Sequence, residues 1–216
     1  MIQSNDTTPQ AAFRIFCIGR NYMEHIHEQN SEMPKAPPIF HKPPTSLVPA
    51  GGKVPFPRHG QELHHETEVV VRIGQGGKPA NIEKALSFVD GVTLGLDLTL
   101  RDVQRYQKQK GLPWEIAKSF DHSAPIGDFV AYNDALNLKE IEFTCRVNGD
   151  IRQQGNTKDM LYPIDSLILE VSKIWQLVPG DLIYTGTPAG VGPLQVGDTI
   201  EIESAQLGSY AWSIVD

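Results

Sequence analysis

With 216 residues, of which 40% are hydrophobic and 21% charged, the chain is long enough to form one domain with a full hydrophobic core. Its formal net charge of −7 makes it a poor electrostatic match for nucleic acid or for an anionic membrane surface. No apolar run approaches the length of a membrane span, and the polar first residues do not resemble a signal peptide. We therefore expect a cytoplasmic protein with neither a nucleic-acid nor a membrane partner.

The first half of the chain is predicted to alternate short strands with short helices. In chain order we expect a strand at 13–18, a helix at 22–29, a strand at 38–42, a strand at 64–73, a helix near 81–88 and a strand near 91–98. The segment 43–60 is rich in proline and glycine, and it is predicted to be a long loop of the kind that is often functional.

The second half carries clearer start and stop signals. We expect a helix at 99–110, with Thr99 as its N-cap and Gly111 at its end. The pair Asn148-Gly149 predicts a tight turn between two strands. The elements expected from there on are strands at 139–148 and 150–154, a helix from Pro163 to about Leu177, a strand at 182–185 and two strands within 198–215.

No linker divides the chain, so residues 1–12 are predicted to be a polar tail and residues 13–216 a single domain. The order of elements indicates a β-rich member of the α+β class. The two cysteines, Cys17 and Cys145, each lie within an apolar, strand-like run. Two cysteines give no disulfide framework, and we expect both to be buried free thiols.

Three carboxylates form the main candidate for a site. Residues i and i+2 of a strand point to the same face, so Glu66 and Glu68 should project together, about 7 Å apart at the backbone. Two unrelated glutamates on a solvated strand face would give the same pattern. Asp97 is the lone acid in an apolar run, where it either binds a metal or caps the next helix. Together the three would select a hard cation, Mg²⁺ or Mn²⁺.

Cationic and polar residues follow these carboxylates along the chain. Arg101, Gln104 and Lys108 share one face of the predicted helix, where they could hold an anionic ligand or form a solvated surface. Lys118 lies in a mostly apolar setting, where it could lose its proton or pair with a substrate. His64 shares the face of the two glutamates, so a Zn²⁺ site is a weaker alternative, since no spaced histidine pair accompanies it.

Two other segments carry groups that could take part in chemistry. His25 and Glu28 are three residues apart on a predicted helix, and a carboxylate beside an imidazole makes a general base for water. A surface pair is the common alternative, and the neighbouring His27 could be mistaken for His25. The glycine-rich turn at 185–192 can offer backbone N–H groups and a hydroxyl to a carboxylate, but it lacks the P-loop pattern.

Taken in order, five segments from about Arg14 onward resemble the fumarylacetoacetate hydrolase family. They are Gly19-Arg20-Asn21-Tyr22, His64-His65-Glu66-Thr67-Glu68, residues 96–104, Lys118-Ser119-Phe120-Asp121 and residues 185–192. The sequence is most similar to the short, single-domain branch of acylpyruvate hydrolases and oxaloacetate decarboxylases. The resemblance implies a mixed β-roll fold, and it implies a homodimer.

The resemblance also implies roles for individual residues. The metal ligands for Mg²⁺ or Mn²⁺ would be Glu66, Glu68 and Asp97. The catalytic groups would be the water-activating pair His25 and Glu28, together with Lys118. A small anionic 2-oxo acid would contact Arg20, Arg101, Gln104 and Thr187. Two features strain the pattern: Lys108 stands where some relatives with larger substrates carry an aromatic residue, and the segment 28–37, which would form a lid, is hard to align.

The activity implied is Mg²⁺-dependent hydrolysis of a carbon–carbon bond in an acylpyruvate or fumarylpyruvate, which releases pyruvate. Decarboxylation or tautomerisation of oxaloacetate and isomerisation of 2-hydroxyhepta-2,4-dienedioate are alternatives on the same site, because all of them use a related enolate. A protein that binds 2-oxo acids without turnover is an alternative of another class. Such a protein would have no need of the His25–Glu28 pair.

Overall fold

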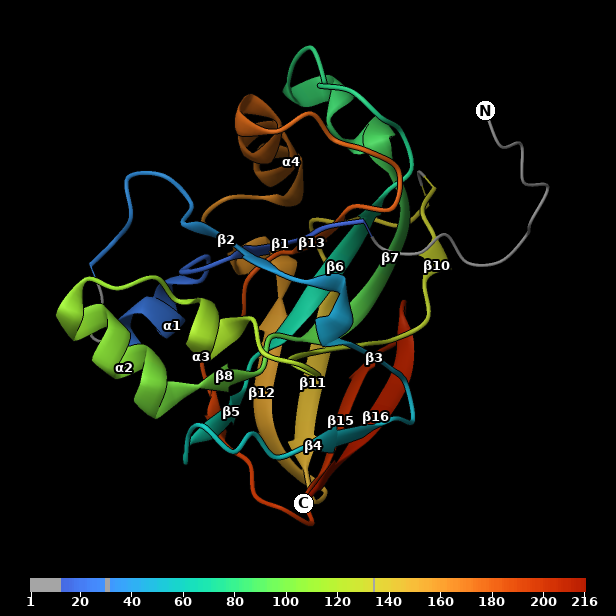
Figure 1. Ribbon diagram of the computed structural model, residues 1–216. Helices are drawn as coiled ribbons and strands as arrows, with labels where there is room; N and C mark the ends of the chain where they lie inside the picture. The colour runs from blue at the N-terminus through green and yellow to red at the C-terminus, as the bar shows by residue number, and fades with distance from the viewer. Residues whose placement is uncertain (1–12, 30–31, 134) are drawn as a thin grey trace, which may run out of the picture.

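Three β-sheets frame the part of the chain that this computed structural model describes, residues 13–29, 32–133 and 135–216 (Figure 1). The largest sheet has the strand order β2-β1-β13-β6-β7-β9-β3, with β10 paired to β7. Its strands are β1 (Ile15–Ile18), β2 (Ile39–Lys42), β3 (Leu47–Pro49), β6 (Thr67–Ile73), β7 (Val89–Leu96), β9 (Ala124–Ile126), β10 (Val130–Ala131) and β13 (Leu182–Tyr184). The predicted tail at 1–12 lies outside the described residues, as do residues 30–31 of the predicted lid.

The second sheet has the order β12-β11-β15-β16-β4, and the third has the order β14-β5-β8. Their strands are β4 (Lys53–Pro55), β5 (Leu63–His65), β8 (Thr99–Leu100), β11 (Glu142–Val147), β12 (Asp150–Asn156), β14 (Gly192–Pro193), β15 (Thr199–Ser204) and β16 (Gly208–Val215). Most neighbours are antiparallel, but β1 pairs with β13, β3 with β9 and β4 with β16 in parallel. The predicted class is therefore confirmed: the fold is a mixed, strand-rich α+β fold with curled sheets.

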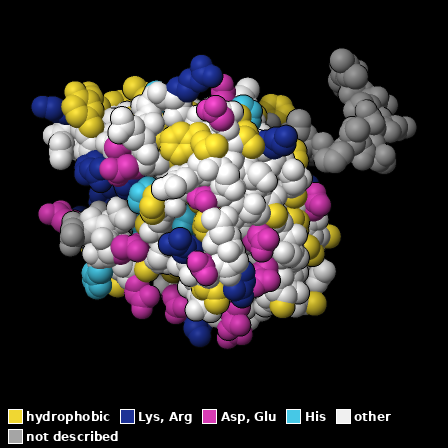
Figure 2. Space-filling view, turned by 90° about the horizontal axis from the view of Figure 1, so that it is seen from below, with side chains coloured by type: hydrophobic (Ala, Val, Ile, Leu, Met, Phe, Trp, Pro, Cys, Tyr) yellow, Lys and Arg dark blue, Asp and Glu magenta, His cyan; other side chains and the backbone are white. Residues whose placement is uncertain are grey.

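Short helices connect the strands of the described residues. They are α1 (Met23–Glu28), α2 (Arg101–Lys110), α3 (Glu115–Lys118) and α4 (Ile164–Ile174), with 3-10 helices η1 (Pro44–Ser46), η2 (Ile82–Lys84), η3 (Leu86–Phe88) and η4 (Thr157–Asp159). Figure 1 shows α1, α2 and α3 gathered on one side of the sheets, with α4 apart from them. No helix among the described residues is long and apolar enough to cross a membrane. On the face in Figure 2, acidic and basic side chains are interspersed.

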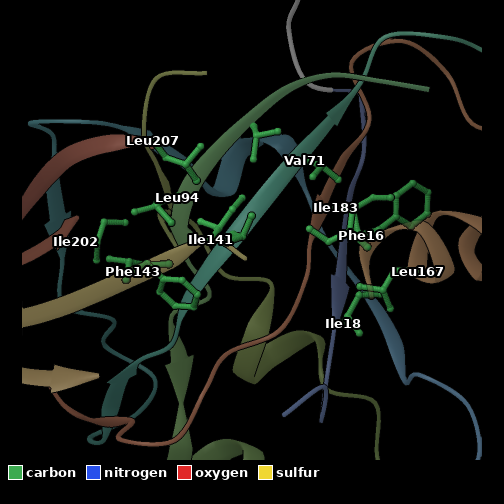
Figure 3. Close-up of a cluster of buried hydrophobic side chains, with 14 of the residues drawn as sticks. Phe16, Ile18, Val71, Leu94, Ile141, Phe143, Leu167, Ile183, Ile202 and Leu207 are labelled. Carbon is green, nitrogen blue, oxygen red and sulfur yellow. The ribbon is translucent and has the colours of Figure 1, made fainter. Parts of the chain in front are cut away.

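One face of the large sheet carries a hydrophobic core that packs against the second sheet at one end and against α4 at the other. Leu94 of β7 points toward Phe143 and Ile202 of the second sheet, whereas Phe16 of β1 lies on the side of Leu167 from α4 (Figure 3). These side chains are at most 3% exposed. Burial of this apolar area holds the central strands in place. Glu68 lies on β6, Glu66 directly precedes β6, and Asp97 directly follows β7.

Two of the predicted turn and helix-end signals are confirmed. Asn148 and Gly149 adopt φ angles of 54° and 87°, in the left-handed region that a tight hairpin turn requires, and they join β11 to β12. Gly111 ends α2 with a φ angle of 64°. Cys17 and Cys145 are buried free thiols, as expected.

The segment 43–60 is not a continuous loop as predicted. It contains η1 and the strands β3 and β4, which lie at the ends of the first and second sheets. Both strands end in proline, and an edge position tolerates proline because a backbone N–H can be missing there. Val48 and Val54 are the residues that these short strands bury. The loop prediction, which rested on proline and glycine content, therefore missed two edge strands.

Three helix predictions were wrong in type or extent. The helix expected near 81–88 is a pair of 3-10 helices, because the chain must enter β7 at Val89 directly after η3. Thr99 is not an N-cap: it belongs to β8, its hydroxyl donates to the carbonyl of Asp97 at 3.1 Å, and α2 begins at Arg101. The helix after Pro163 ends at Ile174 rather than near residue 177.

Candidate functional site

Glu66, Glu68 and Asp97 converge where the first and third sheets meet. Strand β5 pairs with β8 and β14, whereas β6 pairs with β7 and β13, so the chain changes partners at Glu66. The strand predicted at 64–73 is broken there, and the carbonyl of Glu66 accepts a hydrogen bond of 2.8 Å from the N–H of Asp97. One carboxylate oxygen from each of the three acids lies within 4.8 Å of the other two. The sequence therefore brings the three predicted ligands together, although the two glutamates do not share a regular strand.

Cationic side chains surround two of the three carboxylates. The Nζ atom of Lys118 donates to Glu66 at 2.7 Å and to Asp97 at 2.6 Å. Lys42 lies 2.9 Å from Oδ1 of Asp97, and Arg101 donates to Glu66 at 2.5 Å. Burial alone would lower the pKa of Lys118, but the carboxylates of Asp97 and Glu66 raise it. The two carboxylates therefore favour the charged, hydrogen-bond-donating form of Lys118.

Glu68 differs from the other two acids. It is 1% exposed, and its carboxylate accepts a hydrogen bond of 2.8 Å from the N–H of Gly186. Among the described residues it has no ion pair. Burial and repulsion by Asp97 raise the pKa of Glu68 well above its usual range. For Glu66, burial acts in the same direction, but Lys118 and Arg101 hold its pKa well below the usual range.

This donor set fits a divalent cation. Three buried carboxylates with no thiolate select a hard ion such as Mg²⁺ or Mn²⁺. A bound cation would also remove the repulsion between Glu68 and Asp97 that raises the pKa of Glu68. His64 is not part of this group in the described part of the chain, and burial and Arg101 lower its pKa to about 4. The geometry therefore favours the three carboxylates over a zinc site at His64.

His25 and Glu28 form a hydrogen-bonded pair on α1. Nδ1 of His25 lies 3.0 Å from Oε2 of Glu28, and Oε1 of Glu28 accepts a bond of 3.0 Å from the N–H of Gly190. Burial would raise the pKa of Glu28, but the bonds from His25 and Gly190 lower it. An ionised Glu28 requires a proton on Nδ1, which leaves Nε2 as the basic nitrogen. The neighbouring His27 is exposed, so the two histidines are clearly distinguished.

One pocket is shared by His25 and two of the three acidic residues. His25, Glu66, Glu68 and Lys118 line it, and Thr187 does so from the glycine-rich turn. The remaining predicted substrate contacts also reach its wall, together with the helix-face lysine: Arg20, Arg101, Gln104 and Lys108. The pocket therefore gathers cationic groups and hydrogen-bond donors beside a metal-binding candidate, as an anionic, oxygen-rich ligand requires.

Lys42 is a site residue that sequence reasoning missed. Its side chain is fully buried, donates to the carbonyl oxygen of Leu98 at 3.1 Å and to that of Lys118, and pairs with Asp97. A lysine at the end of the otherwise uncharged segment Ile39–Lys42 was the available signal. Its partners lie more than fifty residues further along the chain, so no local pattern indicated them.

Comparison with known proteins identifies the class of enzyme to which this fold and site correspond. The sequence profile described as "Fumarylacetoacetate (FAA) hydrolase C-terminal" matches residues 14–215. The chain belongs to the fumarylacetoacetate hydrolase family.

Individual relatives in this family carry the names of different enzymes. The chain is 43% identical over 187 residues to the mitochondrial oxaloacetate tautomerase FAHD1 of Mus musculus, which covers 87% of this chain and 85% of that one. It is 40% identical over 189 residues to the mitochondrial oxaloacetate decarboxylase of Dictyostelium discoideum, which covers 87% of each. The fumarylpyruvate hydrolase from Pseudomonas aeruginosa, in complex with Mn²⁺ and pyruvate, has a TM-score of 0.91 and 34% identity over 98% of this chain and 92% of that one. These relatives are enzymes whose names span three reactions.

Proposed function

We propose that this protein is a divalent-metal-dependent hydrolase that cleaves a carbon–carbon bond in an acylpyruvate-type 2,4-dioxo acid and releases pyruvate. The observation that carries the proposal is the hydrogen bond from His25 to Glu28, because His25 lines the same pocket as Glu66 and Glu68. Hydrolysis needs a base that activates water, whereas the loss of CO₂ from oxaloacetate does not. The similarity to a fumarylpyruvate hydrolase that holds Mn²⁺ and pyruvate supports the same substrate class.

In the proposed hydrolysis, His25 is the base. Its Nε2 takes a proton from water, while Glu28 holds the proton on Nδ1 and stabilises the imidazolium that forms. The resulting hydroxide attacks the distal acyl carbonyl carbon. The bond from that carbon to the methylene carbon breaks, and its electron pair passes into the enolate of pyruvate. The proton on His25 then moves to the methylene carbon, which completes pyruvate.

In the same proposal, Lys118 and Arg101 stabilise the negative charge of the enolate and of the substrate carboxylate. Lys118 uses two N–H groups for Glu66 and Asp97, so its third can point to a ligand oxygen. Arg101 is held by Glu66 and Gln104, and its Nε–H has no partner among the described residues. A divalent cation bound by the three carboxylates would supply further stabilisation of the developing oxyanion as a Lewis acid.

A second candidate function is decarboxylation or tautomerisation of oxaloacetate. The observation that favours it is the identity of 40–43% to enzymes with those names, which exceeds the 34% identity to the fumarylpyruvate hydrolase. It requires the same enolate stabilisation by Lys118 and Arg101, but it makes no use of a water-activating base. Isomerisation of a related dienoate would use the same groups.

The two candidate functions separate in one experiment. Purified protein with Mg²⁺ or Mn²⁺ is assayed on acetylpyruvate, fumarylpyruvate and oxaloacetate, with EDTA as the metal-free control. We expect His25→Ala to lower hydrolysis by roughly 10²- to 10⁴-fold, the usual contribution of a general base, and to spare oxaloacetate turnover. His27→Ala, an exposed change on the same helix, is the matched control. Equal loss of all activities in His25→Ala would reject the proposed base, and binding without turnover would reject catalysis.

Three further properties are proposed with this activity. Mg²⁺ is proposed as the ion used in the cell, with Mn²⁺ able to replace it. A homodimer is proposed as the assembly. Light scattering during size-exclusion chromatography, which measures the molar mass in solution, would test it. A cytoplasmic location is proposed from the sequence, and fractionation of cells that express the chain would test it.

A further inference from the structure

Gln153 on β12 is a buried polar side chain that connects three segments around the pocket. It is 1% exposed. Its Oε1 accepts a bond of 3.1 Å from the N–H of Thr67 and lies 2.9 Å from Nδ1 of His65. Its Nε2 donates to Oγ1 of Thr187 at 2.7 Å and to the carbonyl of Pro188 at 3.0 Å. All the hydrogen-bonding positions of this amide are therefore used.

The orientation of the Gln153 amide is fixed by its backbone partners. The N–H of Thr67 can only donate, and the carbonyl of Pro188 can only accept. Exchange of the amide oxygen and nitrogen would place donor against donor and acceptor against acceptor. The lost hydrogen bonds could not be replaced by bonds to water, because the site is buried. The Nε2–H group must therefore face Thr187, and the threonine oxygen must accept.

The consequence concerns the hydroxyl proton of Thr187. With its oxygen occupied as an acceptor, Thr187 has its own O–H left to donate, and no acceptor for that proton is found among the described residues. Thr187 is 3% exposed and lines the pocket. The O–H group is therefore available to an oxygen atom of a ligand in the pocket.

We infer that Gln153 is a positioning residue that makes Thr187 a hydrogen-bond donor toward a carboxylate or carbonyl oxygen of the substrate. The inference rests on the proposed function, since it takes a 2-oxo acid as the ligand. The same amide holds the residues on both sides of Glu66, His65 and Thr67, so it ties the substrate contact to the backbone position of a metal ligand. Gln153 acts through Thr187 and does not itself line the pocket.

A double-mutant cycle tests this role. In Gln153→Leu and in Thr187→Val, we expect the KM for the substrate and the dissociation constant of pyruvate from Mn²⁺-loaded protein to rise about tenfold. Thr187→Val removes the hydrogen bond to the charged ligand, and Gln153→Leu removes the contact that orients that hydrogen bond. The value of kcat should change much less. In the Thr187→Val background, Gln153→Leu should add no further rise in KM. Gln154→Leu, an exposed change on the same strand, is the control.

Two more conservative variants keep the inference testable if Gln153→Leu or Thr187→Val fails to fold. Gln153→Glu keeps the size of the side chain but replaces the Nε2 donor by oxygen, and it should raise KM like Gln153→Leu. Thr187→Ser keeps the hydroxyl and should leave KM within about twofold of wild type. An additive rise in KM, or a Gln153→Glu enzyme with unchanged KM, would overturn the inference while the proposed function stands. A wild-type protein that neither turns over nor binds 2-oxo acids would overturn the proposed function itself.

Discussion

The ammonium group of Lys42 lies 2.9 Å from Oδ1 of Asp97, and the side chains of both residues are at most 2% exposed. Oδ2 of the same carboxylate accepts from Lys118. Both oxygens of Asp97 therefore have a cationic partner within the protein. Removal of one partner from a buried ion pair lowers the stability of a protein more than replacement of both partners by apolar residues does, because the remaining charge is then buried without a partner or water.

Lys42→Met is therefore expected to destabilise the protein by about 3–5 kcal/mol, the usual cost of breaking a buried pair. Urea denaturation measures the free energy of unfolding. Lys53→Met, an exposed change in β4, is the matched control and should have little effect. A loss of stability in Lys42→Met no larger than in the control would contradict the buried-pair interpretation.

Gly186→Ala should weaken metal binding. The N–H of Gly186 donates to Glu68, its φ angle is 101°, and an added Cβ would lie 2.7 Å from the Cβ of Asn21. Displacement of this backbone removes the partner that orients Glu68, and loss of such a partner typically costs about 10- to 100-fold in metal affinity. Calorimetric titration with Mn²⁺ measures the change. An affinity equal to that of the wild type would show that the Gly186 contact is not needed.

Gly190→Ala should instead affect hydrolysis. The N–H of Gly190 donates to Glu28, and an added Cβ would lie 2.2 Å from the carbonyl oxygen of Arg152, so the turn must move. We expect a fall in kcat on acylpyruvates with Mn²⁺ affinity nearly unchanged. Gly197→Ala is the control, since the φ angles of Gly190 and Gly197 are similar, at 94° and 96°. At Gly197, however, no atom lies within 4 Å of the added Cβ. If Gly190→Ala weakened Mn²⁺ binding as much as Gly186→Ala, the two glycines would not have separate roles.

Chelation should abolish activity and leave the protein folded. Lys42, Lys118 and Arg101 already compensate the charges of Glu66 and Asp97, so the ion is not needed to hold these two acids in the core. After EDTA treatment, circular dichroism should retain the native spectrum, and added Mn²⁺ should restore turnover. Cooperative unfolding on chelation would show that the cation is structural, as in proteins whose metal binding drives folding.

The two thiols should be unreactive in the native protein. Burial and the nearby Asp97 raise the pKa of Cys17 well above its usual range, and burial raises that of Cys145 to about 11. At pH 8 both remain neutral thiols, and the thiolate is the reactive form. A colorimetric thiol reagent should therefore label both residues in denaturant and neither in buffer. Rapid labelling of one thiol in buffer would contradict its buried position.

Much of the fold could be predicted from patterns that are local in sequence. Val69, Val71 and Ile73 alternate with other residues on β6 and are fully buried, and the Asn148-Gly149 turn needs no distant partner. Asp97 could also be found, because an isolated acid in an apolar run is costly unless it is paired or bound to metal. Glu66 and Glu68 were found from their spacing of two residues. Their roles remain predictions that the experiments above address.

Gln153 shows why other parts could not be predicted. By hydropathy Ile151 is the better candidate for burial, but Ile151 is 49% exposed and Gln153 is buried. The register shifts between Cys145 and Arg146, so that Cys145 pairs with Gln153 and Arg146 with Ile151. A β-bulge of this kind reverses which residues face inward. Bulges depend on packing across the sheet, and neither Gln153 nor Lys42 has its partners nearby in the sequence.

The turn after β13 has a consequence for how this protein could change its chemistry. Within five residues, Gly186 holds a metal-ligand candidate, Thr187 faces the pocket and Gly190 holds the carboxylate beside His25. An insertion or deletion there would displace all three at once. Variation in substrate preference is therefore expected to arise on α2, where the side chains of Gln104 and Lys108 line the same pocket and can be exchanged one at a time without moving the backbone that aligns the reacting groups.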